Sequence, residues 1–163
     1  MGTGKTSVGR ELSTRLGMEF VDTDEVIESR HGPIDRIFAE KGEQAFRQIE
    51  RGLAIELGRR SGLVIATGGR MLLDPANIEA LTRTGRVFCL VASPEEIHRR
   101  VTADEIGRER PLLAVDDPSQ RIAELMAERS DGYAVFPQVD TDHRDVATVA
   151  DEIARLWLGL HTT

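Results

Sequence analysis

The first residues of the chain form a glycine-rich stretch whose residue types suit phosphate binding. Gly4-Lys5-Thr6 matches the end of the motif G-x-x-x-x-G-K-[ST], whose first glycine would fall before Met1. In this motif the loop's N–H groups and the next helix face a phosphate, the lysine contacts the β and γ phosphates, and the hydroxyl binds Mg²⁺. The alternative is a flexible tail. We predict nucleotide contacts from Gly2, Thr3, Gly4, Lys5, Thr6 and Ser7, with Thr6 also a metal ligand.

Two carboxylates follow the next apolar segment. Asp22 and Asp24 lie at the carboxyl end of a predicted strand, the edge where open α/β sheets bind ligands. Asp22 is suited to hold Mg²⁺ or its water shell, and Asp24 to accept a hydrogen bond from a substrate hydroxyl and orient it for attack. The alternative is that these residues cap the helix starting near Glu25, which Thr23 or Asp24 would do well.

A third candidate group lies on a predicted helix. Arg47 and Glu50 are three residues apart and share one helical face. Arg47 is suited to bind a substrate carboxylate through two hydrogen bonds while Glu50 holds its guanidinium in place. The alternative is an ordinary surface ion pair, the more common outcome of this spacing.

A glycine pair follows a second apolar strand. Gly68-Gly69 comes directly after the run 63–67, at a carboxyl edge where the backbone must approach a ligand closely. A plain tight turn explains the pair equally well. Farther along, Arg129 ends a predicted helix and Tyr133 follows it by four residues.

A basic loop lies between two predicted helices. Its residues 107–113 are too polar at their start to be buried, and we predict that the segment of about 104–117 is a lid. Arg110 would stabilise charge on a transferring phosphoryl group as the loop closes. A solvated loop without a role is the alternative.

The elements that must position these residues alternate between short apolar segments and amphipathic helices, a pattern typical of a parallel sheet covered by crossover helices. Ser93-Pro94-Glu95-Glu96 is a helix start signal, since Ser93 can cap and Glu96 can complete a capping box. Strands are predicted at 19–22, 63–67, 86–92 and, more weakly, 138–141. Helices are predicted at 5–16, 24–30, 33–40, 44–60, 75–82, 94–103, 118–129 and 146–158.

Length and composition set the class of protein. The 163 residues fit one globular domain, 1–163, in which 24–60 would carry the substrate-binding helices. A net charge of −7 argues against a general nucleic-acid binder, and no apolar stretch is long enough to span a bilayer. The single cysteine, Cys89, lies in an apolar strand and suits a reducing compartment. We therefore expect a cytoplasmic monomer that binds neither nucleic acid nor membrane.

Together these features occur in the order, and at about the spacings, found in shikimate kinases, small P-loop kinases of the nucleoside-monophosphate-kinase-like class. The resemblance runs from Met1 to about Thr141 and rests on residues that recur together: 22–24, 42–50, 65–69 and 110–113. It implies a three-layer α/β/α parallel sheet of P-loop kinase type. It also implies transfer of the γ-phosphoryl group of ATP to the 3-hydroxyl of shikimate, with Mg²⁺, in the pathway to aromatic amino acids.

Carried over position by position, the resemblance implies roles for the candidate residues. Lys5 and Thr6 resemble the nucleotide and metal residues, and Asp22 the metal-side carboxylate. Asp24 resembles the aspartate that binds and activates the shikimate hydroxyls. Arg47 and Arg129 resemble arginines that bind the substrate carboxylate, and Gly68 and Gly69 resemble glycines that line the substrate pocket. Arg110 resembles the catalytic arginine of the lid, which also contacts the nucleotide.

Three features depart from the family's pattern. Arg70 replaces a third pocket glycine, so its side chain either points away from the substrate site or enters it and alters substrate choice. Asp131 stands where the family usually has proline, close to Arg129. The central strand before the phosphate loop is missing, which would leave both neighbouring strands unpaired. We therefore expect a chain starting at Met1 to fold poorly and the natural reading frame to begin upstream.

Two other functions stay open. The first is a kinase of the same chemistry with another small hydroxylated carboxylic acid as acceptor. The second is a sensing domain that binds a small acid without catalysis, an idea motivated by Arg70 and the shortened phosphate motif. A pure sensor has no need of metal-binding and lid groups together, so the presence of these residues argues against it: Lys5, Thr6, Asp22, Asp24 and Arg110.

Overall fold

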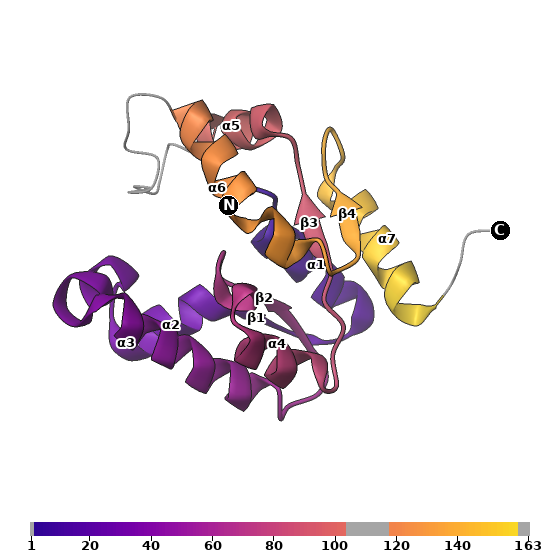
Figure 1. The fold of residues 1–163 in the computed structure, drawn as a ribbon. Helices are drawn as coiled ribbons and strands as arrows, with labels where there is room; N and C mark the ends of the chain where they lie inside the picture. The colour runs from indigo at the N-terminus through magenta and orange to yellow at the C-terminus, as the bar shows by residue number, and fades with distance from the viewer. Residues whose placement is uncertain (1, 104–117, 160–163) are drawn as a thin grey trace.

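The fold is taken from a computed structural model that describes residues 2–103 and 118–159. The predicted lid and Arg110 lie outside the described residues. In chain order the elements are α1 (Lys5–Leu16), β1 (Glu19–Asp22), α2 (Thr23–His31), α3 (Ile34–Leu57), β2 (Leu63–Ala66), the 3₁₀ turn η1 (Met71–Leu73), α4 (Pro75–Thr82), β3 (Cys89–Val91), α5 (Pro94–Ala103), α6 (Pro118–Tyr133), β4 (Gln138–Asp140) and α7 (Val146–Leu158) (Figure 1).

Helix boundaries follow local capping chemistry. The Asp22 carboxylate accepts hydrogen bonds from backbone N–H groups of the first turn of α2, so that helix begins at Thr23, one residue before the predicted start. Asp74 and Asp145 cap α4 and α7 in the same way. The predicted Ser93 cap is confirmed, since its Oγ accepts from the N–H of Glu96 at 3.2 Å.

The two helices predicted for residues 33–60 are present as two helical segments of α3. α3 runs from Ile34 to Leu57, but Gly42 within it has φ 79° and ψ 169°, outside helical geometry. The chain therefore breaks at Gly42, between the two predicted segments. Glycine suits this position because a side chain is strained at such a positive φ.

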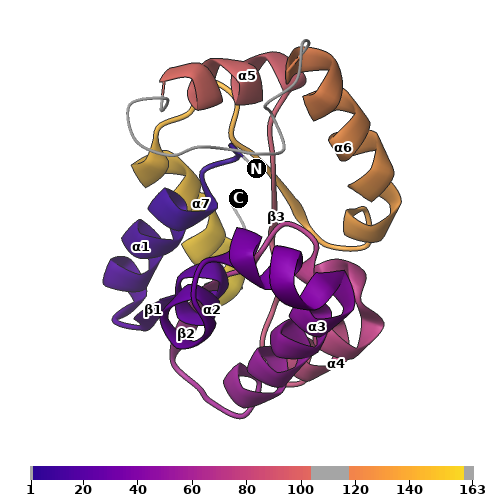
Figure 2. The ribbon, with the colours of Figure 1, turned by 90° about the vertical axis from the view of Figure 1, so that its left-hand side faces the viewer.

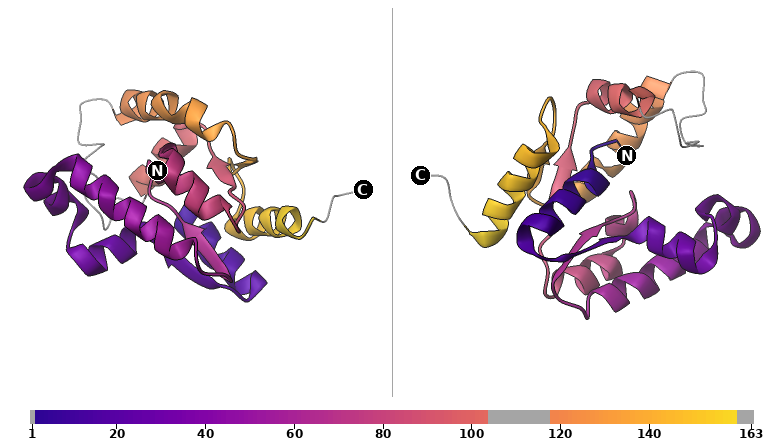
Figure 3. Two further views of the ribbon diagram at one scale, coloured as in Figure 1. Left: turned by 60° about the horizontal axis from the view of Figure 1, so that its bottom comes forward. Right: turned by 180° about the vertical axis from the view of Figure 1, so that it is seen from behind.

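The four strands form two separate parallel pairs. β1 pairs with β2 in the register Glu19 to Leu63, and β3 pairs with β4 in the register Cys89 to Gln138. Within the described part of the chain, nothing joins β2 to β3, and Figures 1 and 3 show the two pairs standing apart. The parallel α/β architecture is confirmed, and the gap lies where the missing central strand was expected. The strand predicted at 86–92 is shorter, Cys89–Val91, because its partner β4 is only three residues long.

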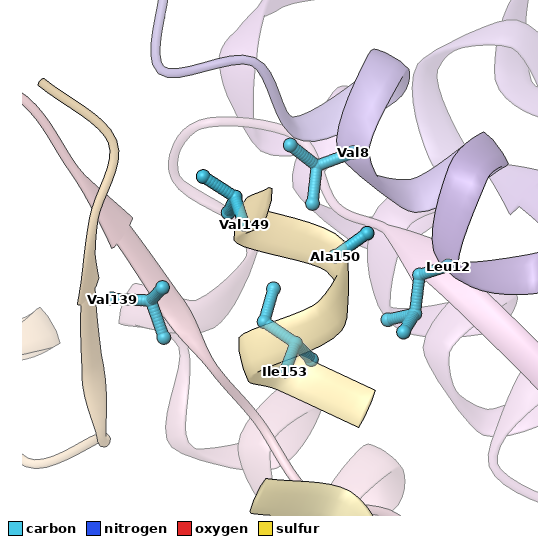
Figure 4. Packing of buried hydrophobic residues seen from close by; sticks show 6 residues of the cluster. All are labelled: Val8, Leu12, Val139, Val149, Ala150 and Ile153. Atoms are coloured by element: carbon cyan, nitrogen blue, oxygen red, sulfur yellow. The ribbon is translucent and has the colours of Figure 1, made fainter. Parts of the chain in front are cut away.

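Helices cover both sides of the strands. Figure 2 shows α1 and α7 on one side, and α3, α4 and α6 on the other. Apolar residues of α1 and α7 interlock with β4 in one buried cluster: Val8, Leu12, Val139, Val149, Ala150 and Ile153 (Figure 4). A second cluster packs α2 and α3 on β1, and a third joins α5 to α6. None of the helices in residues 2–103 and 118–159 is long and apolar enough to cross a membrane.

Candidate active site

The phosphate motif forms a turn that leads into α1. Gly4 has φ 85° and is the residue before the helix, whose amino end carries no side-chain cap and no acidic residue in its first turn. Free N–H groups at such an end attract anions. Lys5 opens the helix and is partly buried; desolvation lowers the pKa of its ammonium group, and the charge of Asp24 opposes that shift. Ser7 lies exposed in the same turn.

Thr6 and Asp22 meet across the space between α1 and β1. The Thr6 hydroxyl donates to Asp22 Oδ2 at 2.9 Å. The other carboxylate oxygen, Oδ1, accepts from the N–H groups of Asp24 at 3.0 Å and Glu25 at 3.4 Å. Asp22 therefore caps α2 with one oxygen and faces Thr6 with the other. The cap is Asp22 and not Thr23 or Asp24, which the sequence favoured, because Asp22 is the last residue before the first turn of α2.

Asp24 projects from the first turn of α2 and is only partly exposed. Burial raises the pKa of its carboxyl group, the nearby Asp22 raises it further, and the Lys5 ammonium opposes both. A carboxylate whose pKa lies above its ordinary value is a better proton acceptor, as general bases require. Asp22, Asp24 and Lys5 thus form one electrostatically linked group.

The end of β2 is attached to the start of α2. Thr23 is fully buried, and its Oγ1 accepts a hydrogen bond of 2.9 Å from the N–H of Gly68. A Cβ added to Gly68 would stand 2.6 Å from Asp24 Oδ1 and 3.4 Å from Glu50 Oε1. The sequence predicts Thr23 only as a helix cap. Thr23 and Gly68 are 45 residues apart, and no local spacing indicates their contact.

Arg47 is held by two carboxylates. Its Nη1 donates to Glu50 Oε2 at 2.6 Å, as predicted, and its Nε and Nη2 donate to Glu43 Oε1 at 3.2 and 2.9 Å. The Glu50 side chain is only 3% exposed, and burial raises its pKa against the opposing effect of Arg47. This is not an ordinary surface ion pair, because one partner is buried and its neighbour across Gly68 is Asp24. The role of Glu43 was missed.

Gly69 and Arg129 lie together. Arg129 Nη1 donates to the Gly69 carbonyl at 3.3 Å, and the Tyr133 hydroxyl donates to the same oxygen at 3.1 Å. Desolvation lowers the pKa of Arg129, whose Nε is buried and has no hydrogen-bond partner among the described residues. An anion that reached this guanidinium would supply the missing hydrogen-bond acceptor.

Arg70 is an exposed residue beside this group. The pKa of Glu43 is lowered mainly by its hydrogen bond from Arg47, with a smaller contribution from the charge of Arg70. The same charge is among the causes that lower the pKa of Arg129. Arg70 therefore adds positive charge near Glu43 and Arg129.

A cavity of about 360 Å³ opens between the end of β2 and α6. Its lining includes Thr3, Lys5, Gly68, Gly69 and Arg129. Phosphate-loop residues and three of the predicted acceptor residues, Gly68, Gly69 and Arg129, thus face one space. Among the residues that the structure describes, no three His, Cys, Asp or Glu side chains cluster as metal ligands. A cation at Thr6 and Asp22 would complete its shell with phosphate oxygens and water, as Mg²⁺ commonly does.

Comparison with known proteins gives consistent matches over the whole chain. A family model described as shikimate kinase matches residues 1–157. A shikimate kinase of Caldanaerobacter subterraneus is 40% identical over 162 residues, covering 98% of this chain and 93% of that protein. One from Thermus thermophilus is 42% identical over 160 residues, covering 96% and 86%.

Solved structures agree. Shikimate kinase from Acinetobacter baumannii in complex with shikimate superposes with a TM-score of 0.87 at 36% identity, covering 100% of this chain and 91% of that one. The deoxyadenosine kinase from M. mycoides with bound dCTP superposes with a TM-score of 0.57 at 14% identity, covering 98% and 95%, a likeness of fold alone.

Proposed function

The chain belongs to the shikimate kinase family, and we propose that it transfers the γ-phosphoryl group of ATP to the 3-hydroxyl of shikimate, with Asp24 at the acceptor and Lys5 at the nucleotide. The observation that carries this assignment of roles is the convergence of Lys5, Asp22 and Asp24 at the carboxyl ends of the strands. That edge is where ligands of open α/β sheets bind.

The acceptor is held from two sides. Arg47, oriented by Glu50 and Glu43, binds the shikimate carboxylate through its remaining donors, and Arg129 binds it from α6. The backbone of Gly68 and Gly69 approaches the ring closely, since an added Cβ at Gly68 would meet Asp24 and one at Gly69 would stand 2.9 Å from Arg129 Nη1.

The nucleotide is held at the amino end of α1. The N–H groups of residues 2–7 surround its phosphates, and Lys5 contacts the β and γ phosphates. Oxygen donors on Thr6 and Asp22 fit Mg²⁺, which would neutralise phosphate charge when bound.

The transfer itself is an in-line displacement. The 3-hydroxyl oxygen of shikimate forms a bond to the γ-phosphorus as the bond from that phosphorus to the β–γ bridging oxygen breaks, and Asp24 takes the hydroxyl proton. ADP leaves with the bridging oxygen. Arg110, in the proposed lid of 104–117, contacts the nucleotide and stabilises charge on the transferring group.

The remaining proposals concern the whole molecule. We propose that residues 1–163 act as one domain, that 24–60 carry the acceptor site, and that the protein is a monomer in the cytoplasm with no nucleic-acid or membrane partner. Light scattering across a range of concentrations checks the monomer. A mass that doubles with concentration would contradict it.

The test of function is ADP release measured with and without shikimate and Mg²⁺. ADP release should require both, and the Mg²⁺ concentration for half-maximal rate should rise about tenfold in Asp22→Asn. Asp35→Asn, a change at an exposed carboxylate on α3, is the matched control and should leave that concentration unchanged. Protein that binds ATP and shikimate without releasing ADP would overturn the assignment.

A further inference from the structure

Residues 68–73 form the turn between β2 and α4, which we call the glycine turn. It carries both site glycines and Arg70. Gly68 and Met71 are buried, and the Met71 N–H donates to the Gly68 carbonyl at 3.1 Å. Gly69 and Arg70, which lie between them, are exposed. The glycine turn therefore has fixed ends and an exposed apex that needs support of its own.

Side chains of two helices hold the ends of the glycine turn. Thr23 Oγ1 of α2 accepts the hydrogen bond of 2.9 Å from the Gly68 N–H. Asn77 Nδ2 of α4 donates to the Met71 carbonyl at 2.9 Å. Thr23 is 0% exposed and Asn77 is 2% exposed, and hydrogen bonds in such a buried setting are costly to break. Both ends are thus held independently of the apex.

The apex is held from α6. The Gly69 carbonyl accepts two hydrogen bonds, one from the Tyr133 hydroxyl at 3.1 Å and one from Arg129 Nη1 at 3.3 Å. Arg129 and Tyr133 are four residues apart, so they share one face of the helix. Burial raises the pKa of Tyr133, and the charge of Arg129 opposes that shift. A phenol whose pKa is raised stays protonated at neutral pH and remains a donor to the Gly69 carbonyl.

The two donors to the Gly69 carbonyl have different tasks in the proposed function. Arg129 lines the cavity of about 360 Å³ together with Gly69 and Tyr133, and it is one of the two arginines proposed to bind the acceptor's carboxylate. A guanidinium binds a carboxylate best through two parallel N–H groups, so one that must also hold a carbonyl is restricted in the orientations it can take. Tyr133 has no part in the proposed transfer and is available to hold the carbonyl in its place.

We propose that Tyr133 is a positioning residue of the acceptor site: its hydroxyl holds the Gly69 carbonyl, so that the guanidinium of Arg129 can turn to the acceptor's carboxylate. Tyr133 acts through Gly69 and Arg129 and does not itself touch the acceptor. When the hydroxyl is removed, the Gly69 carbonyl draws its hydrogen bond from Arg129, and acceptor binding weakens. This inference rests on the proposed function, because it takes a hydroxylated carboxylic acid as the acceptor.

The first test is Tyr133→Phe, which removes the hydroxyl and keeps the ring. KM for shikimate should rise about fivefold, the loss expected for one neutral hydrogen bond, while kcat and KM for ATP stay unchanged. Thr82→Val is the matched control, since it removes a hydroxyl that donates to the Ile78 carbonyl at 2.7 Å, at the end of α4 remote from the glycine turn. It should leave all three constants unchanged. An unchanged KM for shikimate in Tyr133→Phe would overturn the proposal, as would an equal rise in KM for ATP.

Arg129→Lys shows whether the effect of Tyr133 passes through Arg129. Lysine lacks the planar pair of donors, so this change alone should raise KM for shikimate. In the Arg129→Lys background, Tyr133→Phe should raise KM by less than about twofold, because residues that act through one another have effects that do not add. An effect of about fivefold in that background would contradict action through Arg129.

Amide hydrogen exchange tests the hold on the apex without any acceptor. The Leu73 N–H donates to the carbonyl of Arg70 at the apex at 3.0 Å, and in Tyr133→Phe it should exchange about tenfold faster. The Met71 N–H, which donates to Gly68 between the two fixed ends, is the internal reference and should be unchanged. Equal exchange of Leu73 in the variant and the wild type would overturn the proposal. A wild type that releases no ADP in response to shikimate would instead overturn the proposed function and leave the exchange result unaffected.

Discussion

Gly68 and Asp24 lie so close that no side chain fits between them: a Cβ on Gly68 would stand 2.6 Å from Asp24 Oδ1. The approach is enforced by the hydrogen bond from the Gly68 N–H to Thr23 Oγ1, which ties the end of β2 to the start of α2. The position of the carboxylate thus depends on a backbone contact between two elements that are distant in sequence.

Gly68→Ala is expected to displace Asp24 and Glu50 together. Because a small misplacement of reacting groups is costly, kcat/KM for shikimate should fall by about 100-fold. Crowding of two carboxylates should also reduce the free energy of unfolding by about 1–3 kcal/mol. Steady-state kinetics and urea unfolding measure the two effects.

The matched control for that change is Gly52→Ala. Gly52 lies inside α3, and an added Cβ would meet nothing within 4 Å. Alanine should stabilise the helix by about 0.5–1 kcal/mol and leave the kinetics unchanged. Wild-type kinetics in Gly68→Ala would show that the close approach to Asp24 is without consequence for turnover.

Asp24→Asn should reduce kcat by about 10²–10⁴-fold while ATP binding is retained. Because the pKa of Asp24 is raised by burial, kcat/KM of the wild type should fall on acidification through a pKa above the ordinary value for aspartate. The residual activity of the asparagine variant should lack that step. A pH profile of both proteins provides the measurement.

Asp24→Asn should lower activity but raise the stability of the fold. A carboxyl group whose pKa is raised on folding stabilises the fold when protonated, and that contribution is lost as pH rises through the folded-state pKa. At a pH above the folded-state pKa, the ionised carboxylate of Asp24 therefore destabilises the fold, and asparagine removes that cost. The variant should then melt a few degrees higher, on the order of 3 °C. An unchanged or lower melting temperature would contradict the raised pKa.

Arg47→Lys should separate the geometry of Arg47 from its charge. Lysine retains a cation beside buried Glu50 but lacks the planar pair of donors that a carboxylate needs, so KM for shikimate should rise about tenfold with a smaller change in kcat. Arg36→Lys, in an exposed ion pair with Glu40 on the same helix, is the control and should leave KM unchanged. Equal effects of the two substitutions would rule out a specific role for Arg47.

Local spacing was enough to select several residues that the structure brings together at the candidate site. The phosphate motif identified Lys5 and Thr6, and the strand-end pair Asp22 and Asp24 follows from their separation of two residues. The gap in the sheet was also predictable, because a phosphate loop requires a strand before it. These features depend on neighbours in sequence or on a fixed motif.

Contacts between distant segments could not be predicted in this way. Gly69 accepts hydrogen bonds from residues 60 and 64 positions later, Arg129 and Tyr133. Thr23 holds Gly68 through a hydroxyl that looked like a helix cap. Such contacts depend on how α6, β2 and α2 pack against one another. The same polar side chain can cap a helix or form a tertiary hydrogen bond, and the packing decides which.

Glu96 should govern part of the acid sensitivity of the fold. Hydrogen bonds, first from Arg99 and then from Arg100, lower the pKa of its carboxyl group to about 2 from 4.5. A lowered pKa stabilises the fold above the unfolded-state value, and this stability is lost as pH falls from about 4.5 to about 2. Urea unfolding of Glu96→Gln should therefore show a shallower loss of stability in that window.

The control for the acid series is Glu95→Gln, since Glu95 is the exposed neighbour of Glu96 on α5. The free energy of unfolding of Glu95→Gln should fall with pH as steeply as that of the wild type. Because Arg100 also donates to the Gly2 carbonyl at 3.4 Å and to Thr141 Oγ1 at 3.0 Å, Glu96→Gln should loosen the phosphate loop as well. If Glu96→Gln lost stability with falling pH as steeply as the wild type, Glu96 would not be a cause of the acid sensitivity.

Arg70 should act on the acceptor through its charge. It is exposed, directly follows Gly69, and its charge reaches Glu43 and Arg129 at the acceptor side of the site. An added cation attracts an anionic acceptor, and salt screens an exposed cation strongly. Arg70→Gln should therefore raise KM for shikimate about threefold at low salt, with little change in kcat and a much smaller effect at 0.5 M salt, roughly three times the physiological ionic strength. Arg59→Gln, at an exposed arginine just after α3, should leave KM unchanged at both salt concentrations. A fall in KM, or an effect independent of salt, would show that Arg70 obstructs the acceptor and does not attract it.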